Sequence, residues 1–187
     1  MNKDILSNFY NELLPLFQPQ TEKQASRLKP QDLEHANFRY IFSVDGMIKI
    51  SRLIEGSVIN TPGAADAHVS FQYFSRIAAQ KKQYKRVAES AKGLWLYGVP
   101  DAPLPQFPRT VGINTSGTPL EDYWFVVAYG PGIYSCLLAK EIDPQSGQRI
   151  YEGFFTFETQ TAYQIILILS QMFPAQVPTP IPPSEHR

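Results

Sequence analysis

Apolar residues recur at helical spacing in four segments of the chain. Near the N-terminus, Ile5, Phe9 and Leu13 fall on one helical face, although Pro15 interrupts the pattern. A later segment begins at Asp45, whose carboxylate is suited to cap the first free amides of a helix. The last segment is apolar nearly all round, which is typical of a buried helix. The spacing predicts helices over residues 3–17, 44–60, 76–92 and 161–173.

Runs of β-branched and aromatic residues between these helices predict strands over residues 68–74, 93–99, 109–114, 122–130, 133–142 and 149–157. The first two flank the helix at 76–92, and a strand–helix–strand unit of this length favours parallel strands. Turn sequences at 130–132 and 143–148 divide the later strands and predict an antiparallel meander. The fold class is therefore α/β (α+β): a mixed sheet, made of the strand–helix–strand unit followed by the meander, flanked by helices.

The two ends of the chain differ in composition from the middle. Residues 18–36 are polar, contain two prolines and are expected to form a connector. Residues 174–183 contain five prolines, which predicts an extended tail or linker. We therefore divide the chain into an N-terminal helix and connector (1–45), one domain (46–173) and a proline-rich tail (174–187).

Composition narrows the class of protein. The 187 residues form one ordinary domain, and 17 basic residues balance 17 acidic ones, which argues against a nucleic-acid binder. No signal peptide and no run of about 20 apolar residues is present, so the expectation is a cytoplasmic protein without a membrane span. The predicted helix at 76–92 has a basic outer face that includes Arg76 and Lys82. Such a face is typical of solvated amphipathic helices, and it would also suit phosphate binding.

Residues with catalytic or metal-binding potential are few and scattered. Cys136 stands alone within a predicted strand, which excludes an intramolecular disulfide and favours a core role. His35, His68 and His186 are far apart and have no metal-ligand spacing. We therefore expect no catalytic residue and no metal ligand, and the sequence does not indicate a cofactor.

The predicted meander carries an unusual number of aromatic residues on both faces of its strands. A sheet buried on both sides accounts for them, and a pocket for a flat ligand or a dimer face would account for them as well. If a ligand site exists, we expect six residues to line it: Trp124, Tyr134, Glu141 and Glu152 in the meander, with Trp95 and Tyr97 on a neighbouring strand. Their alternative roles are core packing and strand-end solvation.

Three segments resemble the DICT sensory domain, a family named after diguanylate cyclases and two-component systems. They are LEDYWFVVAYGPGIYSCLLAKE at 120–141, RIYEGFFTFE at 149–158, and VSFQYFSRIAAQKKQYKRVAESAKGLWLYGVPD at 69–101. The resemblance extends from about residue 46 to 173. Tyr151 stands where the family usually has phenylalanine, and Phe155 where tryptophan is frequent, and both keep the aromatic character.

The resemblance implies a non-catalytic bacterial sensory input domain that regulates a partner effector. Such partners are histidine kinases, cyclic-di-GMP enzymes such as diguanylate cyclases, or GAF-containing proteins, and a part in light responses is implied as well. A second copy of the chain would be a further partner, and the two would form a homodimer. The alternative function is a protein–protein adaptor without a small-molecule ligand, which would use the apolar stripe from Ile5 to Phe17 or the proline-rich tail as its docking surface.

Overall fold

A seven-stranded mixed sheet forms the centre of the fold, in the order β1-β7-β6-β5-β2-β3-β4. The computed structural model describes residues 5–33 and 35–186. β2 pairs in parallel with β3, and β3 in parallel with β4, whereas the other neighbours pair antiparallel. The strands are β1 (Phe38–Ser43), β2 (Asp66–Tyr73), β3 (Leu94–Val99), β4 (Thr110–Asn114), β5 (Tyr123–Gly130), β6 (Ile133–Ile142) and β7 (Ile150–Thr156). The fold is thus mixed α/β, as the sequence predicts.

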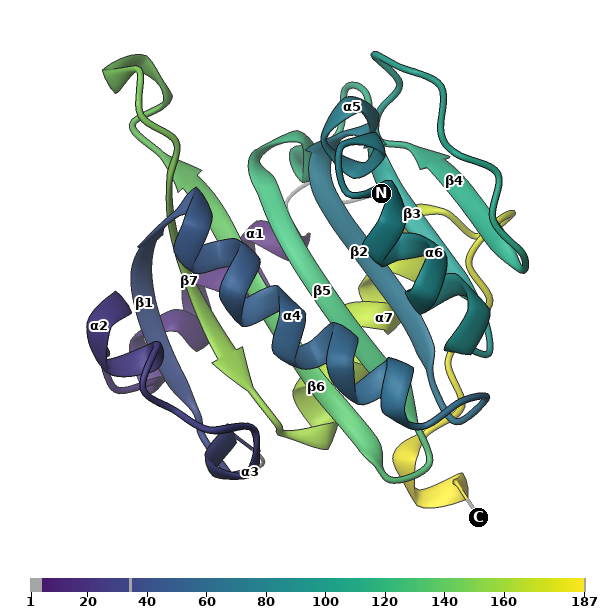
Figure 1. Ribbon diagram of the computed structural model, residues 1–187, viewed down its shortest axis with the longest axis horizontal. Helices are drawn as coiled ribbons and strands as arrows, with labels where there is room; N and C mark the ends of the chain where they lie inside the picture. The colour runs from purple at the N-terminus through teal and green to yellow at the C-terminus, as the bar shows by residue number, and fades with distance from the viewer. Residues whose placement is uncertain (1–4, 34, 187) are drawn as a thin grey trace.

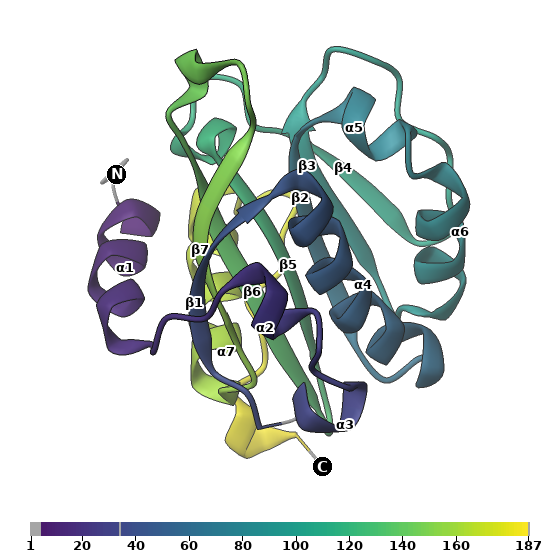
Figure 2. The same cartoon turned by 60° about the vertical axis from the view of Figure 1, so that its left-hand side comes forward.

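Helices cover both faces of this sheet and make three layers (Figures 1 and 2). One face carries α4 (Val44–Asn60), α5 (Phe74–Ala78) and α6 (Lys81–Ser90), and the other carries α1 (Ile5–Leu13) and α7 (Thr159–Met172). Two short helices, α2 (Glu22–Ala25) and α3 (Pro30–Leu33), lie beside β1 (Figure 2). No helix within the described ranges is both long and apolar enough to cross a bilayer.

Each face of the sheet has its own hydrophobic core. Met47 and Ile54 of α4 pack with Val69 and Phe155 on one side, while Ile165 of α7 packs on the other. All eight residues of β5 are buried, because this central strand is covered on both faces. Burial on both sides therefore explains most of the aromatic residues in the meander.

The parallel pairing of β2 with β3 and the antiparallel meander of β5, β6 and β7 confirm two predictions. The predicted strand at 109–114 forms as β4, but its place in the meander was wrong. β4 pairs in parallel with β3, and β5 instead pairs with β2. The reason is that the connection over residues 100–109 returns the chain to the starting end of β3, so that β4 extends the parallel part of the sheet.

The strand β1 was not predicted. Phe38, Tyr40 and Phe42 point into the α4 core, and β1 pairs with β7 at the edge of the sheet. Residues before β1 protect this edge, because the Arg39 amide donates to the Gln18 carbonyl at 3.0 Å and the Gln20 amide donates to the Arg39 carbonyl at 2.8 Å.

Two predicted helices differ in detail from the structure. The expected capping residue Asp45 is wrong: Ser43 caps α4, and its hydroxyl accepts from the Gly46 amide at 3.2 Å. The predicted helix at 76–92 is divided into α5 and α6 at Ala79 and Gln80. Ile77 and Tyr84 are seven residues apart and both pack in the same core. One continuous helix would place them on the same face as well, so the apolar spacing does not reveal the break.

The N-terminal helix is shorter than predicted. It covers residues 5–13 and continues as a 3-10 turn over residues 14–16, where Pro15 lies. Residues 3 and 4 of the predicted helix lie outside the described residues. Leu6 and Tyr10 are buried against the sheet, and the Tyr10 hydroxyl donates to the Glu152 carbonyl at 2.7 Å. The stripe of Ile5, Phe9 and Leu13 packs beside the same core but remains half-buried.

Candidate functional site

The structure distributes the six residues expected to line a ligand site over both faces of the sheet. Trp124 and Glu141 face α4, where Trp124 packs edge-on to Tyr151. The other four face α7 and α1, but Glu152 is on the side of the sheet near β1, away from the rest. The remaining three, Trp95, Tyr97 and Tyr134, lie towards the last residues of the chain. Of the six, only Trp95 lines the cavity beneath the C-terminal residues, while Tyr97 and Tyr134 contact other rings of its wall.

A buried histidine joins two of these residues. The Nδ1 atom of His68 on β2 lies 2.9 Å from the hydroxyl of Tyr97 on β3, and its ring stacks on Trp95 with centroids 4.5 Å apart and planes at 3°. The parallel register of β2 and β3 causes this contact, because His68 lies directly beside Trp95. Only 2% of His68 is exposed, and its desolvation lowers the pKa of the imidazole to about 3. His68 is therefore neutral at physiological pH.

The C-terminal segment, residues 174–186, closes over this group of rings. The indole Nε1 of Trp95 donates to the Gln176 carbonyl at 3.0 Å, and the Tyr129 hydroxyl donates to the Ile181 carbonyl at 2.5 Å. The Tyr134 hydroxyl lies 2.7 Å from Nδ1 of His186. The segment is extended only in part: residues 174–176 form a turn, residues 178–182 have no regular structure, and Pro183–Glu185 form a 3-10 helix. The sheet holds the segment at both ends.

A cavity of about 520 Å³ lies between the C-terminal segment and the sheet. We call it the tail cavity. Its aromatic walls are His68, Trp95 and Tyr129, and Asp66 and Lys92 place opposite charges at its edge. The other residues that line it are Ala64, Gly93, Gly130, Pro131, Ile166, Pro178, Thr179, Pro180, Ile181, Glu185 and His186. This volume is in the range of small-molecule sites, which are mostly apolar with a few polar groups.

Two polar groups in the tail cavity are suited to ligand recognition. The Nε2 atom of His68 forms no hydrogen bond with the residues that the structure describes, and it keeps some contact with solvent although most of the ring is buried. Burial raises the pKa of the Asp66 carboxyl, and nearby Lys92 opposes this effect. A neutral imidazole and a carboxyl beside stacked rings can orient a flat molecule that carries hydrogen-bonding groups at its edge.

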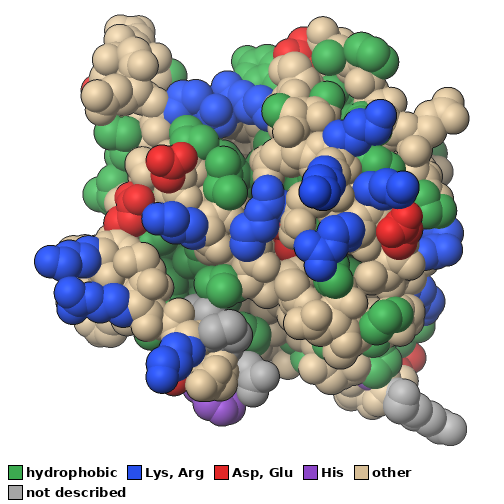
Figure 3. Space-filling model, in the orientation of Figure 1, with side chains coloured by type: hydrophobic (Ala, Val, Ile, Leu, Met, Phe, Trp, Pro, Cys, Tyr) green, Lys and Arg blue, Asp and Glu red, His purple; other side chains and the backbone are tan. Residues whose placement is uncertain are grey.

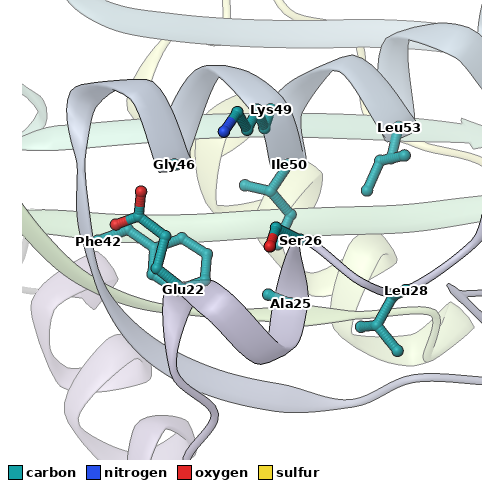
Figure 4. A pocket seen from close by; sticks show the side chains of 9 residues that line it. All are labelled: Glu22, Ala25, Ser26, Leu28, Phe42, Gly46, Lys49, Ile50 and Leu53. Carbon is teal, nitrogen blue, oxygen red and sulfur yellow. The ribbon is translucent and has the colours of Figure 1, made fainter.

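A second cavity, of about 210 Å³, lies between α2 and α4 (Figure 4). Its walls are mostly apolar, including Leu28, Ile50 and Leu53, and Lys49 stands at one side. Its acidic residue, Glu22, already accepts hydrogen bonds from the amide and hydroxyl of Ser43 at 3.1 and 2.9 Å. This cavity is smaller, and its carboxylate is committed to the start of α4.

Sequence reasoning missed His68, Tyr129 and His186 as members of the site. A single histidine in a strand gives no signal of a site, since such residues are usually core residues. The contacts of the C-terminal segment join residues more than 50 positions apart, which a local pattern does not show. Across residues 5–33 and 35–186, no three His, Cys, Asp or Glu side chains gather closely enough to hold a metal ion.

The comparison with known proteins gives a family. The family model of DICT, described as a sensory domain in diguanylate cyclases and two-component systems, matches residues 26–142, which is more than half of the chain. The match begins before β1 and ends with β6, so it starts earlier and stops earlier than the resemblance seen in the sequence. No curated protein matches the chain significantly. The chain belongs to the DICT family of sensory domains.

Proposed function

We propose that this chain is a sensory input module that binds a small flat ligand in the tail cavity and regulates a partner effector. The observation that carries the proposal is His68, buried between Trp95 and Tyr97 with its Nε2 atom unpartnered among the described residues. This nitrogen keeps some contact with solvent, so a ligand with a hydrogen-bonding group can pair with it while packing beside Trp95. The family supports a role in signalling, since DICT domains belong to cyclases and two-component systems.

The C-terminal segment would transmit the signal. Because it covers the tail cavity through Trp95, Tyr129 and Tyr134, a ligand changes the free energy of the covered state relative to an open one. A coupling of about 1–3 kcal/mol is typical of allosteric proteins and would change the equilibrium some 5- to 150-fold. The effector would be a histidine kinase, a diguanylate cyclase or a GAF-containing protein that reads this equilibrium.

The stimulus follows from the nature of the ligand. A light response would require a pigment in the tail cavity, because tyrosine and tryptophan side chains do not absorb visible light. A metabolite would serve equally well as a chemical signal. In either case the chain acts by binding, without a catalytic residue of its own.

The alternative, an adaptor without a small-molecule ligand, has less support from the structure. The docking surfaces expected for it are only partly available: Leu6 of α1 and Val177 of the C-terminal segment are buried, whereas Leu16 and Ile181 are 72% and 52% exposed. An adaptor would also leave the tail cavity without a role.

Native mass spectrometry of the full chain, purified from its own organism, tests the proposal. We expect an additional mass that disappears on denaturation. Replacing Trp95 with alanine removes one wall of the tail cavity and should weaken retention roughly tenfold. Ala64→Leu, which narrows the cavity without removing a wall, should also weaken retention of the additional mass.

The matched control is Leu53→Ala, which alters the cavity between α2 and α4. It should retain the additional mass, provided that circular dichroism shows each variant folded. A wild-type chain without any additional mass, or a mass lost only in Leu53→Ala, would contradict binding in the tail cavity.

A further inference from the structure

Two arginines meet on the opposite face of the sheet, away from the tail cavity. Arg76 lies on α5, and Arg149 lies immediately before β7. We call them the arginine pair. Both approach the hydroxyl of Tyr151: Arg149 through Nη2 at 2.6 Å and Nε at 3.1 Å, and Arg76 through Nη1 at 3.4 Å.

A strained residue holds this cluster together. Gln72 has a φ of 73° in a bulge of β2, although 98% of its surface is buried. Bulges and such backbone conformations are concentrated at functional sites, where they direct a side chain to a required position. Here they turn the Gln72 amide into the α4 face of the sheet, where it can reach Tyr151 and Glu141.

The hydrogen bonds of Gln72 fix the polar groups around the arginine pair. Its Oε1 atom accepts from the Tyr151 hydroxyl at 2.6 Å and from Arg76. Its Nε2 atom donates to Glu141 at 2.8 Å and to the Glu121 carbonyl at 3.1 Å. Glu141 is thus held by a neutral amide and does not form an ion pair with either arginine.

The arginine pair forms no direct ion pair with a described carboxylate, although Glu141 and Asp101 lie near enough to Arg76 to interact with its charge. Among the described residues, no carboxylate oxygen lies within 4.0 Å of either guanidinium. Burial, and then repulsion from Arg149, lowers the pKa of Arg76, while Glu141 partly offsets this. Two cations on one hydroxyl are unfavourable unless an anion joins them, and arginine forks match oxyanions well. Figure 3 shows a continuous basic surface between α5 and the hairpin of β6 and β7.

We propose that the arginine pair binds a phosphate-class oxyanion carried by a small molecule. A phosphate-class dianion matches two guanidinium groups that approach from different elements, because its several oxygens can accept hydrogen bonds from both forks at once, whereas a single carboxylate offers only two oxygens. This site lies on a different face from the tail cavity, so it is independent of the function proposed above. It also gives a role to Arg76, which belonged to the basic face predicted for residues 76–92 and lies on α5, apart from the other basic residues on α6.

Titration of the full chain with inorganic phosphate and pyrophosphate tests the site. The readout is the NMR chemical shifts of the arginine Nε–Hε groups and of the backbone amides of Gln72 and Glu141. Sodium chloride keeps the ionic strength constant. We expect saturable shifts with both probes. Acetate serves as a carboxylate for comparison, and pyrophosphate should bind more tightly than acetate. Arg149→Gln should weaken binding roughly 10- to 100-fold, because it removes a charge-assisted contact.

The control is Arg86→Gln, an exposed residue on the outer face of α6, which should leave binding unchanged. Arg149 is the main variant because Arg76 also bonds to the Phe71 carbonyl and supports the fold. Three results would overturn the proposal: no saturable shift, acetate binding as tightly as pyrophosphate, or equal losses in Arg149→Gln and Arg86→Gln.

Discussion

At the residue scale, His68 has the environment most sensitive to pH. It is buried, neutral and stacked on Trp95, with desolvation lowering the pKa of its imidazole to about 3 from the ordinary 6.5. In the unfolded chain the same imidazole titrates near its ordinary pKa. Between these two values the unfolded state binds a proton that the folded state does not, so acid favours unfolding.

We predict that this histidine contributes stability that is complete above pH 6.5 and is lost as the pH falls towards 3. Between pH 7 and pH 5 the loss from this one group should be about 2 kcal/mol in the free energy of unfolding. The measurement is urea unfolding of the wild type and His68→Gln at both pH values. His68→Gln should lose about 2 kcal/mol less than the wild type over this interval.

Tyr97→Phe is the matched control, because it removes the hydroxyl next to Nδ1 but keeps the histidine. It should lose stability with acid in the same way as the wild type. If His68→Gln and the wild type lose equal stability between pH 7 and pH 5, the imidazole is not buried in its neutral form.

The same residues show why the site was predicted only in part. Trp95 and Tyr97, expected on one strand, do share a face, because they are two residues apart. Trp124 and Glu141 were placed with them, but they face α4, since the register between strands decides which faces meet. Register depends on long-range pairing, and a single sequence does not display it.

At the scale of elements, the start of α4 includes a close approach between a glycine and a carboxylate. A Cβ atom at Gly46 would lie 2.6 Å from Cδ of Glu22, whose carboxylate holds the amide and hydroxyl of Ser43. Gly56, ten residues later in the same helix, has no atom within 4 Å of such a Cβ. The two glycines therefore form a matched pair within one element.

We predict opposite effects of alanine at these positions. Gly56→Ala should stabilise the protein by about 1 kcal/mol, because alanine favours the helix. Gly46→Ala should destabilise it by about 1 kcal/mol, because displacing the carboxylate breaks charge-assisted hydrogen bonds. Thermal and urea unfolding measure both effects. In a Glu22→Ala background, Gly46→Ala should no longer destabilise; equal stabilisation by both alanines in the wild type would contradict the contact.

The elements themselves were largely predictable, and their exceptions have physical causes. Long periodic segments such as α4 and the strands β5 and β6 appear where the hydrophobic pattern places them. β1 was missed although Phe38, Tyr40 and Phe42 alternate correctly, because this short run directly precedes a helix and follows a polar segment. The bulge at Gln72 leaves no local signal, since it depends on Tyr151 and Glu141 from the other half of the chain.

At the scale of the whole molecule, the sheet separates two candidate sites. The tail cavity lies on the face of α7, and the arginine pair lies on the face of α4. The family match ends at residue 142, so β7, α7 and the C-terminal segment lie beyond it. The segment that covers the tail cavity is therefore a feature of this chain that the family match alone does not describe.

The most direct test of the account is hydrogen–deuterium exchange of the ligand-free full chain, with and without a small-molecule extract of its own organism. We predict altered exchange in residues 174–186 and in the adjoining parts of β2 and β3, because a ligand in the tail cavity changes how the C-terminal segment is held. Trp95→Ala should abolish the change, and Leu53→Ala should preserve it. Unaltered exchange, or a change confined to α2 and α4, would contradict the claim that this chain senses a ligand beneath its C-terminal segment.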